Sequence, residues 1–264
     1  MLISSWLRRT QSFELLLEIR EDGFIRPPDE AQRNWLLNRF VREAGDDLLA
    51  LDAIARRFVP GGRRELPADM RHAELSDEQI MEDWQLPLME AMAGIAGRSG
   101  GDVLEIGFGR GVSAGLLQRQ GLRSHTVIEC NDSVIGRFEC WRATLPGRDI
   151  RLVPGLWQDV IGSLGQFDAV FFHTYALDED ESVEFLANSV TFAAHFFPVA
   201  AAHLRPGGVF TYLTNEIDSV GRAHQRLLFE HFSTLRLQRV ALTLPPDVRD
   251  AWWADSMVVI EAVK

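Results

Sequence analysis

From Gly101 onward the chain alternates short apolar runs with stretches of helical periodicity, and this alternation restricts the possible folds more than any other feature. The apolar runs cover residues 102–107, 124–129, 150–155, 168–173, 208–214, 237–244 and 256–263. Helical patterns lie between most of them, at residues 111–120, 133–145, 157–164 and 185–204. This order predicts an α/β fold with a seven-stranded, mostly parallel sheet covered by helices on both faces. Ligands of such sheets bind beyond the carboxyl ends of the strands, near the point where strand order reverses.

The first 75 residues differ in composition from this alternating region. Residues 60–70 (PGGRRELPADM) are polar and contain Pro and Gly, as linkers do. Upstream, the spacing of apolar residues between 28 and 58 predicts two amphipathic helices. We therefore divide the chain into a helical appendage or lid at 1–75 and a main domain at 76–264. The appendage is expected to pack on the main domain or to join two copies of the chain in a homodimer.

Composition and charge narrow the class of protein. The chain has 264 residues, of which 46% are hydrophobic and 25% charged, which suits a folded chain with a large core. Its formal net charge is −11. Proteins that bind nucleic acids or anionic membranes usually carry basic surfaces, so neither partner is expected. The sequence has only two cysteines and no signal-peptide pattern, and none of its apolar runs approaches the ~18 residues of a membrane span. These features predict a cytoplasmic protein.

Three glycines, Gly107, Gly109 and Gly111, stand between the first apolar run and the helical pattern that follows it. Glycine allows a tight turn there and lets the backbone approach a ligand closely. The pattern alone is weak evidence, since such turns occur in nucleotide enzymes of several classes and in proteins that bind no nucleotide. Glu105 precedes the first glycine, and its negative charge suits a ligand with a cationic part better than a pyrophosphate.

Glu129 ends the second apolar run, where a carboxylate can accept hydrogen bonds from both hydroxyls of a ribose. A Pro-Gly-Gly turn lies within Leu204–Tyr212, just before the fifth predicted strand. Taken with the glycine turn and Glu105, these features favour S-adenosylmethionine as the cofactor over a dinucleotide.

Seven sequence segments repeat the order of segments found in one known group of enzymes. They read IMEDWQLPLMEAMA, VLEIGFGRGVSAGLL, HTVIECNDSVIGRF, GLWQDV, FDAVFFHTYAL, LRPGGVFTYLTN and LPPDVRDAWW. In this order they resemble guanidinoacetate N-methyltransferase and its arginine-methylating relatives. The resemblance covers about Ser76 to Lys264 and implies a Rossmann-like class I methyltransferase fold.

The resemblance also implies a role for each residue that matches the cofactor site. Gly107 and Gly109 would line the methionine moiety, and Glu129 would hold the ribose. Met81 and Trp84 would close over the cofactor and the substrate. The residues that the resemblance places around the adenosine are Cys130, Leu156, Trp157 and Gln158. At the last of these positions the family has an acidic residue.

Two positions depart from the pattern that binds a guanidinium in the family. The family has a carboxylate after the tryptophan of the segment before the first strand, and another at the end of the fourth strand. Here these positions hold Gln85 and His173. A guanidinium pairs with bidentate carboxylates, and burying it without one is costly. The departures therefore shift the expected acceptor from guanidinoacetate to a neutral amine, heteroaromatic nitrogen, phenol or carboxylate. Alternative acidic partners for a guanidinium are Asp178, Glu179, Asp180, Glu216 and Asp218.

His173, at the end of the fourth apolar run, is the candidate catalytic residue. An imidazole with its ordinary pKa of about 6.5 accepts a proton near neutral pH, so His173 is predicted to act as a general base or to orient the substrate. The alternative is a structural histidine hydrogen-bonded within its loop. The candidate substrate contacts are Trp84, Gln85, Tyr175 and Asn215. Cysteine and histidine spacings match no metal motif, so no metal site is expected.

The sequence thus predicts an S-adenosylmethionine-dependent methyltransferase acting on a small molecule. An amine or heteroaromatic nitrogen is the favoured acceptor, with oxygen as an alternative. Two other hypotheses stay open. One is an arginine or guanidino N-methyltransferase that uses other acids. The other is a cofactor-binding partner or regulatory subunit without catalysis.

Overall fold

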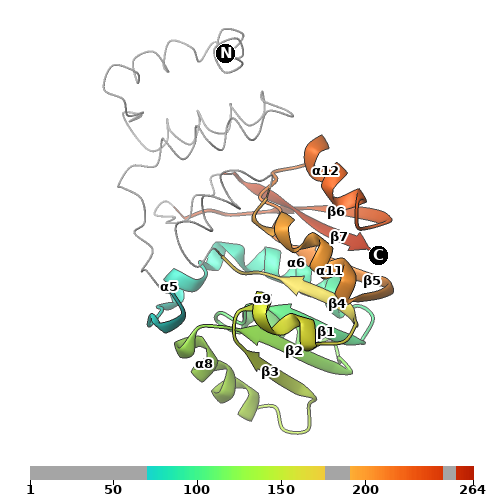
Figure 1. Ribbon diagram of the computed structural model, residues 1–264. Helices are drawn as coiled ribbons and strands as arrows, with labels where there is room; N and C mark the ends of the chain where they lie inside the picture. The colour runs from blue at the N-terminus through green and yellow to red at the C-terminus, as the bar shows by residue number, and fades with distance from the viewer. Residues whose placement is uncertain (1–69, 176–190, 246–253) are drawn as a thin grey trace.

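The protein is built around one seven-stranded sheet with the order β3-β2-β1-β4-β5-β7-β6 (Figure 1). This computed structural model describes residues 70–175, 191–245 and 254–264. The strands are β1 (Asp102–Ile106), β2 (Ser124–Glu129), β3 (Ile150–Pro154), β4 (Phe167–Phe172), β5 (Leu204–Tyr212), β6 (Thr234–Ala241) and β7 (Ser256–Val263). Strands β1 to β5 pair in parallel, and β7 runs antiparallel between β5 and β6. The predicted seven-stranded, mostly parallel sheet is confirmed, with its order reversing between β1 and β4.

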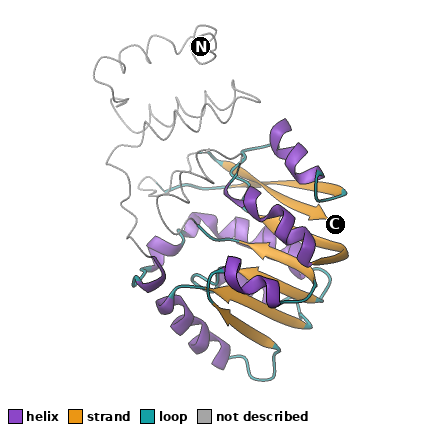
Figure 2. Cartoon of the chain, viewed as in Figure 1, coloured by secondary structure: helices purple, strands orange, loops and turns teal. Residues whose placement is uncertain are grey.

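Helices cover both faces of this sheet (Figure 2). The α-helices are α5 (Asp77–Ile80), α6 (Leu86–Gly97), α7 (Val112–Gln118), α8 (Asp132–Ala143), α9 (Trp157–Val160), α11 (Phe197–His203) and α12 (Arg222–Phe229). Short 3₁₀ segments are η2 (Met70–His72), η3 (Asp83–Gln85), η4 (Ile161–Ser163) and η6 (Phe192–Phe196). None of the helices in the described ranges is long and apolar enough to cross a membrane.

The core is divided by the sheet into two sides. Leu104 and Ile106 of β1 pack with η6, α11 and α12 on one side. Val103, one residue along, packs on the other side with α6 and α7. Because side chains alternate across a strand, both faces of β1 are buried, which explains why its apolar run is nearly continuous.

The structure differs from the predicted elements in several places. The strand β5 begins at Leu204, four residues before the predicted start, because Leu204 pairs with Phe167 and the register then shifts. The helical pattern predicted at 185–204 is divided, within its described part, into η6 and α11. Pro198 lies in the first turn of α11, where its missing N–H costs no hydrogen bond. The helix α12 was not predicted.

Residues 72–77 lie along the start of α8. Ala73 accepts a hydrogen bond from Asn131 Nδ2 at 2.8 Å, and Leu75 accepts one from Arg137 Nη2 at 2.6 Å. His72 lies 2.7 Å from Asp132 at the N-terminus of α8. The end of the predicted appendage therefore contacts the main domain. The predicted amphipathic helices and the predicted homodimer contact lie in residues 1–69, outside the described residues.

Candidate cofactor and acceptor site

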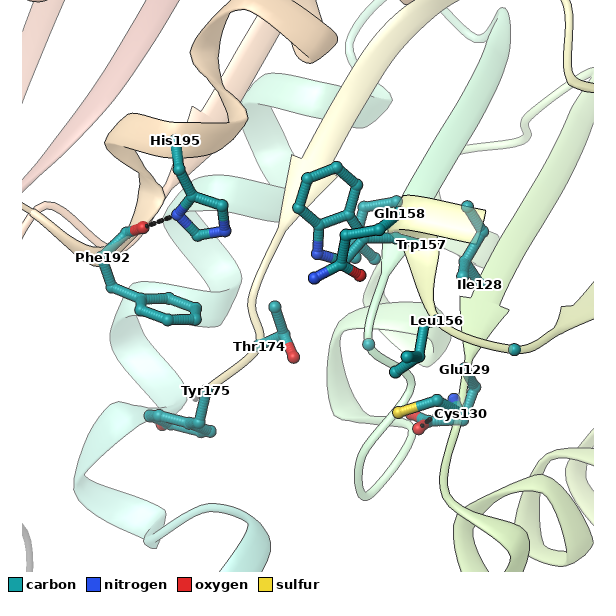
Figure 3. Close-up of a pocket in the computed structure, with 13 residues that line it drawn as sticks. Ile128, Glu129, Cys130, Leu156, Trp157, Gln158, Thr174, Tyr175, Phe192 and His195 are labelled. Atoms are coloured by element: carbon teal, nitrogen blue, oxygen red, sulfur yellow. Dashed lines mark hydrogen bonds between the residues drawn. The ribbon is translucent and has the colours of Figure 1, made fainter. Parts of the chain in front are cut away.

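A pocket lies at the carboxyl ends of the parallel strands, beside the point where the strand order reverses (Figure 3). Its empty volume is ≈ 390 Å³, which includes space open to solvent. Its lining residues are Ile106, Gly107, Ile128, Glu129, Cys130, Gly155, Leu156, Trp157, Gln158, Thr174, Tyr175, Phe192 and His195. Since this is where sheets of this order bind their ligands, the position alone marks the pocket as a cofactor site.

Six of the residues predicted to bind the cofactor meet in this pocket, although they come from three separate segments. They are Gly107 after β1, Glu129 and Cys130 at the end of β2, and Leu156, Trp157 and Gln158 after β3. Their contact with S-adenosylmethionine stays a prediction.

The turn after β1 passes directly against the end of β4. Gly107 has φ +88°, and a Cβ there would collide with the carbonyl oxygen of His173. Gly107 is therefore required both by its backbone conformation and by the close approach of the two strands. Gly109 and Gly111 do not line the pocket. Gly109 continues the turn, and Gly111 is the N-cap of α7.

Glu129 fastens this turn to the end of β2. Its Oε2 accepts hydrogen bonds from the backbone N–H of Phe108 at 2.9 Å and of Gly109 at 3.5 Å. Its Oε1 accepts from the N–H of Cys130 at 2.8 Å and of Asn131 at 2.9 Å. A carboxylate that receives several backbone N–H groups is firmly held, so Glu129 is oriented before any ligand binds.

Glu105, which the sequence predicts to lie near the cofactor, is packed inside the protein instead of lining the pocket. Its side chain is fully buried, receives the hydroxyl of Ser113 and lies 2.9 Å from Nε2 of His125. Nδ1 of that histidine lies 3.2 Å from Nε2 of Gln118. Because the amide nitrogen donates, Nδ1 of His125 accepts and the ring proton is on Nε2, the atom nearest to the Glu105 carboxylate. The structure does not bring Glu105 to the pocket; its carboxylate ties β1 to α7 and β2.

Three of the predicted acceptor-site residues form one cluster at the rim of the pocket. The Tyr175 hydroxyl lies 3.2 Å from Oε1 of Gln85 and 3.3 Å from Nε2 of His173. Since Oε1 only accepts, the Tyr175 hydroxyl donates a hydrogen bond to Gln85 and accepts one from the N–H of His173. Tyr175 lines the pocket, whereas Gln85 is buried behind it. We call Gln85, His173 and Tyr175 the acceptor trio.

His173 is half-buried, and burial lowers its pKa to about 4. Its imidazole is therefore neutral at pH 7 and a weaker base than an exposed histidine. Neutrality suits hydrogen bonding to a substrate better than proton uptake.

The remaining predicted residues do not line the pocket. Met81 and Trp84 are buried against α6, and Asn215 is exposed in the loop after β5 with φ 57°. Glu216, one alternative acid, is buried and accepts from Gly221 N–H while lying 3.1 Å from Nδ1 of His224. Asp218 is exposed and also outside the lining. Asp178, Glu179 and Asp180 lie outside the described residues.

Sequence reasoning missed six pocket residues, which are Ile106, Ile128, Gly155, Thr174, Phe192 and His195. Thr174 directly follows the candidate base, so its place at the strand end was a usable signal. Phe192 and His195 belong to a segment whose apolar pattern looked like a plain core helix. Nothing in that pattern marks them as facing a ligand.

The sheet order and the pocket at its switch point define a class I, S-adenosylmethionine-dependent methyltransferase. Residues 65–228 match the family described as Guanidinoacetate N-methyltransferase, and the chain belongs to that family. The matched range contains every residue that lines the pocket.

Two relatives are similar to part of the chain. The chain is 27% identical over 145 residues to protein arginine N-methyltransferase 2 of Eremothecium gossypii, covering 50% of this chain and 32% of that protein. It is 30% identical over 118 residues to protein arginine N-methyltransferase 2 of Aspergillus oryzae, covering 42% and 28% respectively. The chain thus spans less than a third of the length of these relatives.

A solved structure of spermidine synthase in complex with the transition state analogue AdoDATO is similar in fold. It superposes with a TM-score of 0.50 at 15% identity, over 68% of this chain and 61% of that chain. At this identity the likeness concerns the fold alone.

Proposed function

We propose that this methyltransferase transfers the methyl group of S-adenosylmethionine to a nitrogen atom of a small acceptor held against the acceptor trio. The observation that carries the proposal is the place of Tyr175, which lines the cofactor pocket and hydrogen-bonds to both Gln85 and His173. An acceptor bound to Tyr175 and His173, with Gln85 holding the Tyr175 hydroxyl from behind, would lie next to the cofactor, as a direct transfer requires.

The pocket residues fit the cofactor that the family uses. Gly107 lines the pocket with backbone alone, and the Glu129 carboxylate lies at the end of β2, where sheets of this kind hold a ribose. Leu156 and Trp157 supply apolar walls suited to a flat base. S-adenosylmethionine, when bound, supplies an electrophilic methyl group on a sulfonium.

The acceptor trio acts by positioning. It offers an amide, a phenol hydroxyl and a neutral imidazole, which together can orient an N–H group and direct its lone pair. None of the three carries a negative charge at neutral pH. The contribution of the trio is therefore to geometry and hydrogen bonding, because holding the nucleophile in line supplies most of the rate in such transfers.

Family membership favours a guanidino group as the acceptor. The matched family and both arginine N-methyltransferase relatives act, by their names, on guanidino nitrogen. A guanidinium would then need a carboxylate from outside the acceptor trio, since Gln85 and His173 are neutral. This alternative from the sequence analysis is better supported by the comparisons than the neutral acceptor is.

A neutral amine or heteroaromatic nitrogen is the second candidate, and the chemistry of Gln85 and His173 favours it. The buried Gln85 amide pairs with Tyr175 without needing a counter-ion. A neutral acceptor can replace or extend this hydrogen bonding at no cost of burying charge.

One acceptor panel tests both candidates. The purified protein is incubated with methyl-labelled S-adenosylmethionine and guanidinoacetate, arginine, an arginyl peptide, primary amines or imidazoles, and the methylated product is identified by mass. Methylated guanidino products would support the first class, and products from amines or imidazoles alone would support the second. S-adenosylhomocysteine binding without any methylated product would instead favour the non-catalytic alternative.

A further inference from the structure

His195 lines the cofactor pocket, yet neither the sequence pattern nor the family resemblance gave it a role. It lies on η6, with Phe192 three residues earlier on the same wall (Figure 3). Its ring faces Trp157 at a centroid distance of 5.6 Å and an interplanar angle of 39°. His195 is thus a polar side chain placed in an otherwise aromatic part of the pocket.

The hydrogen bonding of His195 determines which ring nitrogen carries the proton. Nδ1 is hydrogen-bonded to the backbone carbonyl of Phe192, as the dashed line in Figure 3 marks. A carbonyl only accepts, so Nδ1 holds the proton and Nε2 is a hydrogen-bond acceptor in the neutral ring. Burial lowers the pKa of His195, with the Phe192 hydrogen bond acting against that shift. The ring is therefore neutral at pH 7.

The rest of the pocket indicates what reaches this nitrogen. Glu129 is the carboxylate at the end of β2, where a ribose is held. Figure 3 shows Glu129 and Cys130 on one side of the pocket and Phe192 and His195 on the opposite side, with Trp157 between them. A base attached to a ribose at Glu129 would extend across this space, along apolar and aromatic walls that suit a flat ring.

We propose that His195 is a specificity residue for the cofactor, whose Nε2 accepts a hydrogen bond from the exocyclic amino group of adenine. That amino group carries two protons, so the amide oxygen of Gln158 on the neighbouring wall can accept the second. The proposal concerns the base of the cofactor and is independent of which acceptor is methylated.

Binding of two ligands to one variant tests this role without any turnover. The ligands are S-adenosylhomocysteine and its 6-deamino analogue, which lacks only the exocyclic amino group. Wild-type protein should bind the analogue at least about 3- to 10-fold more weakly, because the amino group makes the hydrogen bond to His195 and can make a second one to Gln158. His195→Phe keeps an aromatic ring beside Trp157 but has no acceptor. This variant should bind S-adenosylhomocysteine about 3- to 10-fold more weakly than wild type and the analogue with little change.

Two further variants control the measurement. His203 is a histidine whose Nδ1 is also hydrogen-bonded to a backbone carbonyl, that of Gly165 at 3.0 Å, but it does not line the pocket. His203→Phe should leave the affinity for both ligands unchanged. His195→Gln, whose amide oxygen can accept the same proton, should keep part of the preference for the amino group.

Calorimetry with both ligands decides the outcome. An equal loss of affinity for the two ligands in His195→Phe would show a packing role and overturn the proposal. So would a wild-type protein that does not distinguish them. If His195→Phe does not fold, the comparison of wild type with His195→Gln still tests the proposal, because the wild-type preference is required in any case.

Discussion

The carbonyl oxygen of His173 lies against the α-carbon of Gly107, so that a side chain at residue 107 and the present path of β4 exclude each other. One residue belongs to the cofactor turn and the other to the acceptor trio. In the proposed function, this backbone contact sets the spacing between cofactor and acceptor.

Gly107→Ala tests this contact. We expect a loss of stability of at least 1–2 kcal/mol from the left-handed backbone alone, with more from the collision, and much weaker S-adenosylhomocysteine binding. Gly115→Ala in α7 is the matched control, since a Cβ there meets nothing within 4 Å. It should leave binding intact and stabilise the helix by about 0.5–1 kcal/mol. Urea unfolding and calorimetry measure both, and equal behaviour of the two variants would contradict the argument.

Glu129→Ala should weaken S-adenosylhomocysteine binding by roughly 1.5–3 kcal/mol, because charged hydrogen bonds to the ribose are lost. It should also lower the free energy of unfolding, since the backbone N–H groups of Phe108 and Cys130 lose their acceptor. Glu139→Ala removes an exposed carboxylate that pairs with Arg142 across one turn of α8, and should change neither quantity by more than about 0.5 kcal/mol. Unchanged affinity in folded Glu129→Ala protein would remove Glu129 from the cofactor site.

His173→Ala should lower turnover by about 10²-fold, with little change in S-adenosylmethionine affinity, through loss of an oriented contact. His173→Asn should keep more activity than His173→Ala, because an amide can hydrogen-bond but cannot act as the base. Steady-state kinetics and calorimetry on both variants check this. Wild-type turnover in His173→Ala would show that the histidine is not involved.

The low pKa of His173 has a consequence for pH dependence. With a pKa of about 4 in the folded protein against about 6.5 when unfolded, the unfolded state binds more protons between these values. The contribution of His173 to stability is therefore present above pH 6.5 and is lost as the pH falls toward 4. Unfolding measured from pH 7 to pH 4 should show a smaller loss of stability in His173→Asn than in wild type. If stability falls equally with pH in wild type and His173→Asn, burial does not lower the pKa of His173.

Gln85→Glu combined with His173→Asp restores the two carboxylates that a guanidinium prefers. If the acceptor trio determines acceptor charge, this double variant should raise kcat/KM for guanidinoacetate by roughly 10- to 100-fold over wild type. Tyr175→Phe, which removes the shared hydroxyl without adding charge, should not raise it. Efficient wild-type turnover of guanidinoacetate with no gain in the double variant would show that acids outside the trio bind the guanidinium.

Much of the fold followed from the sequence because buried parallel strands leave nearly continuous apolar runs. The seven strands and the glycine turn were predictable for that reason. The helix α12 was missed because it has few buried residues, among them Leu228 and the polar His224. The sequence placed Glu105 at the ligand because this residue precedes the glycine turn. Its pairing with His125 could not be predicted, because it depends on how β2 packs beside β1. His195 was missed since its exposure to the pocket depends on the break before α11.

The hydrogen bonds of Glu129 to backbone N–H groups on both sides make the length of this side chain as important as its charge. Its two oxygens reach the amides of two different loops, and an aspartate, one methylene shorter, could not span both while keeping the same backbone. Residue 129 therefore sets the distance between the glycine turn and the start of α8, and a shorter side chain would move these two segments relative to each other.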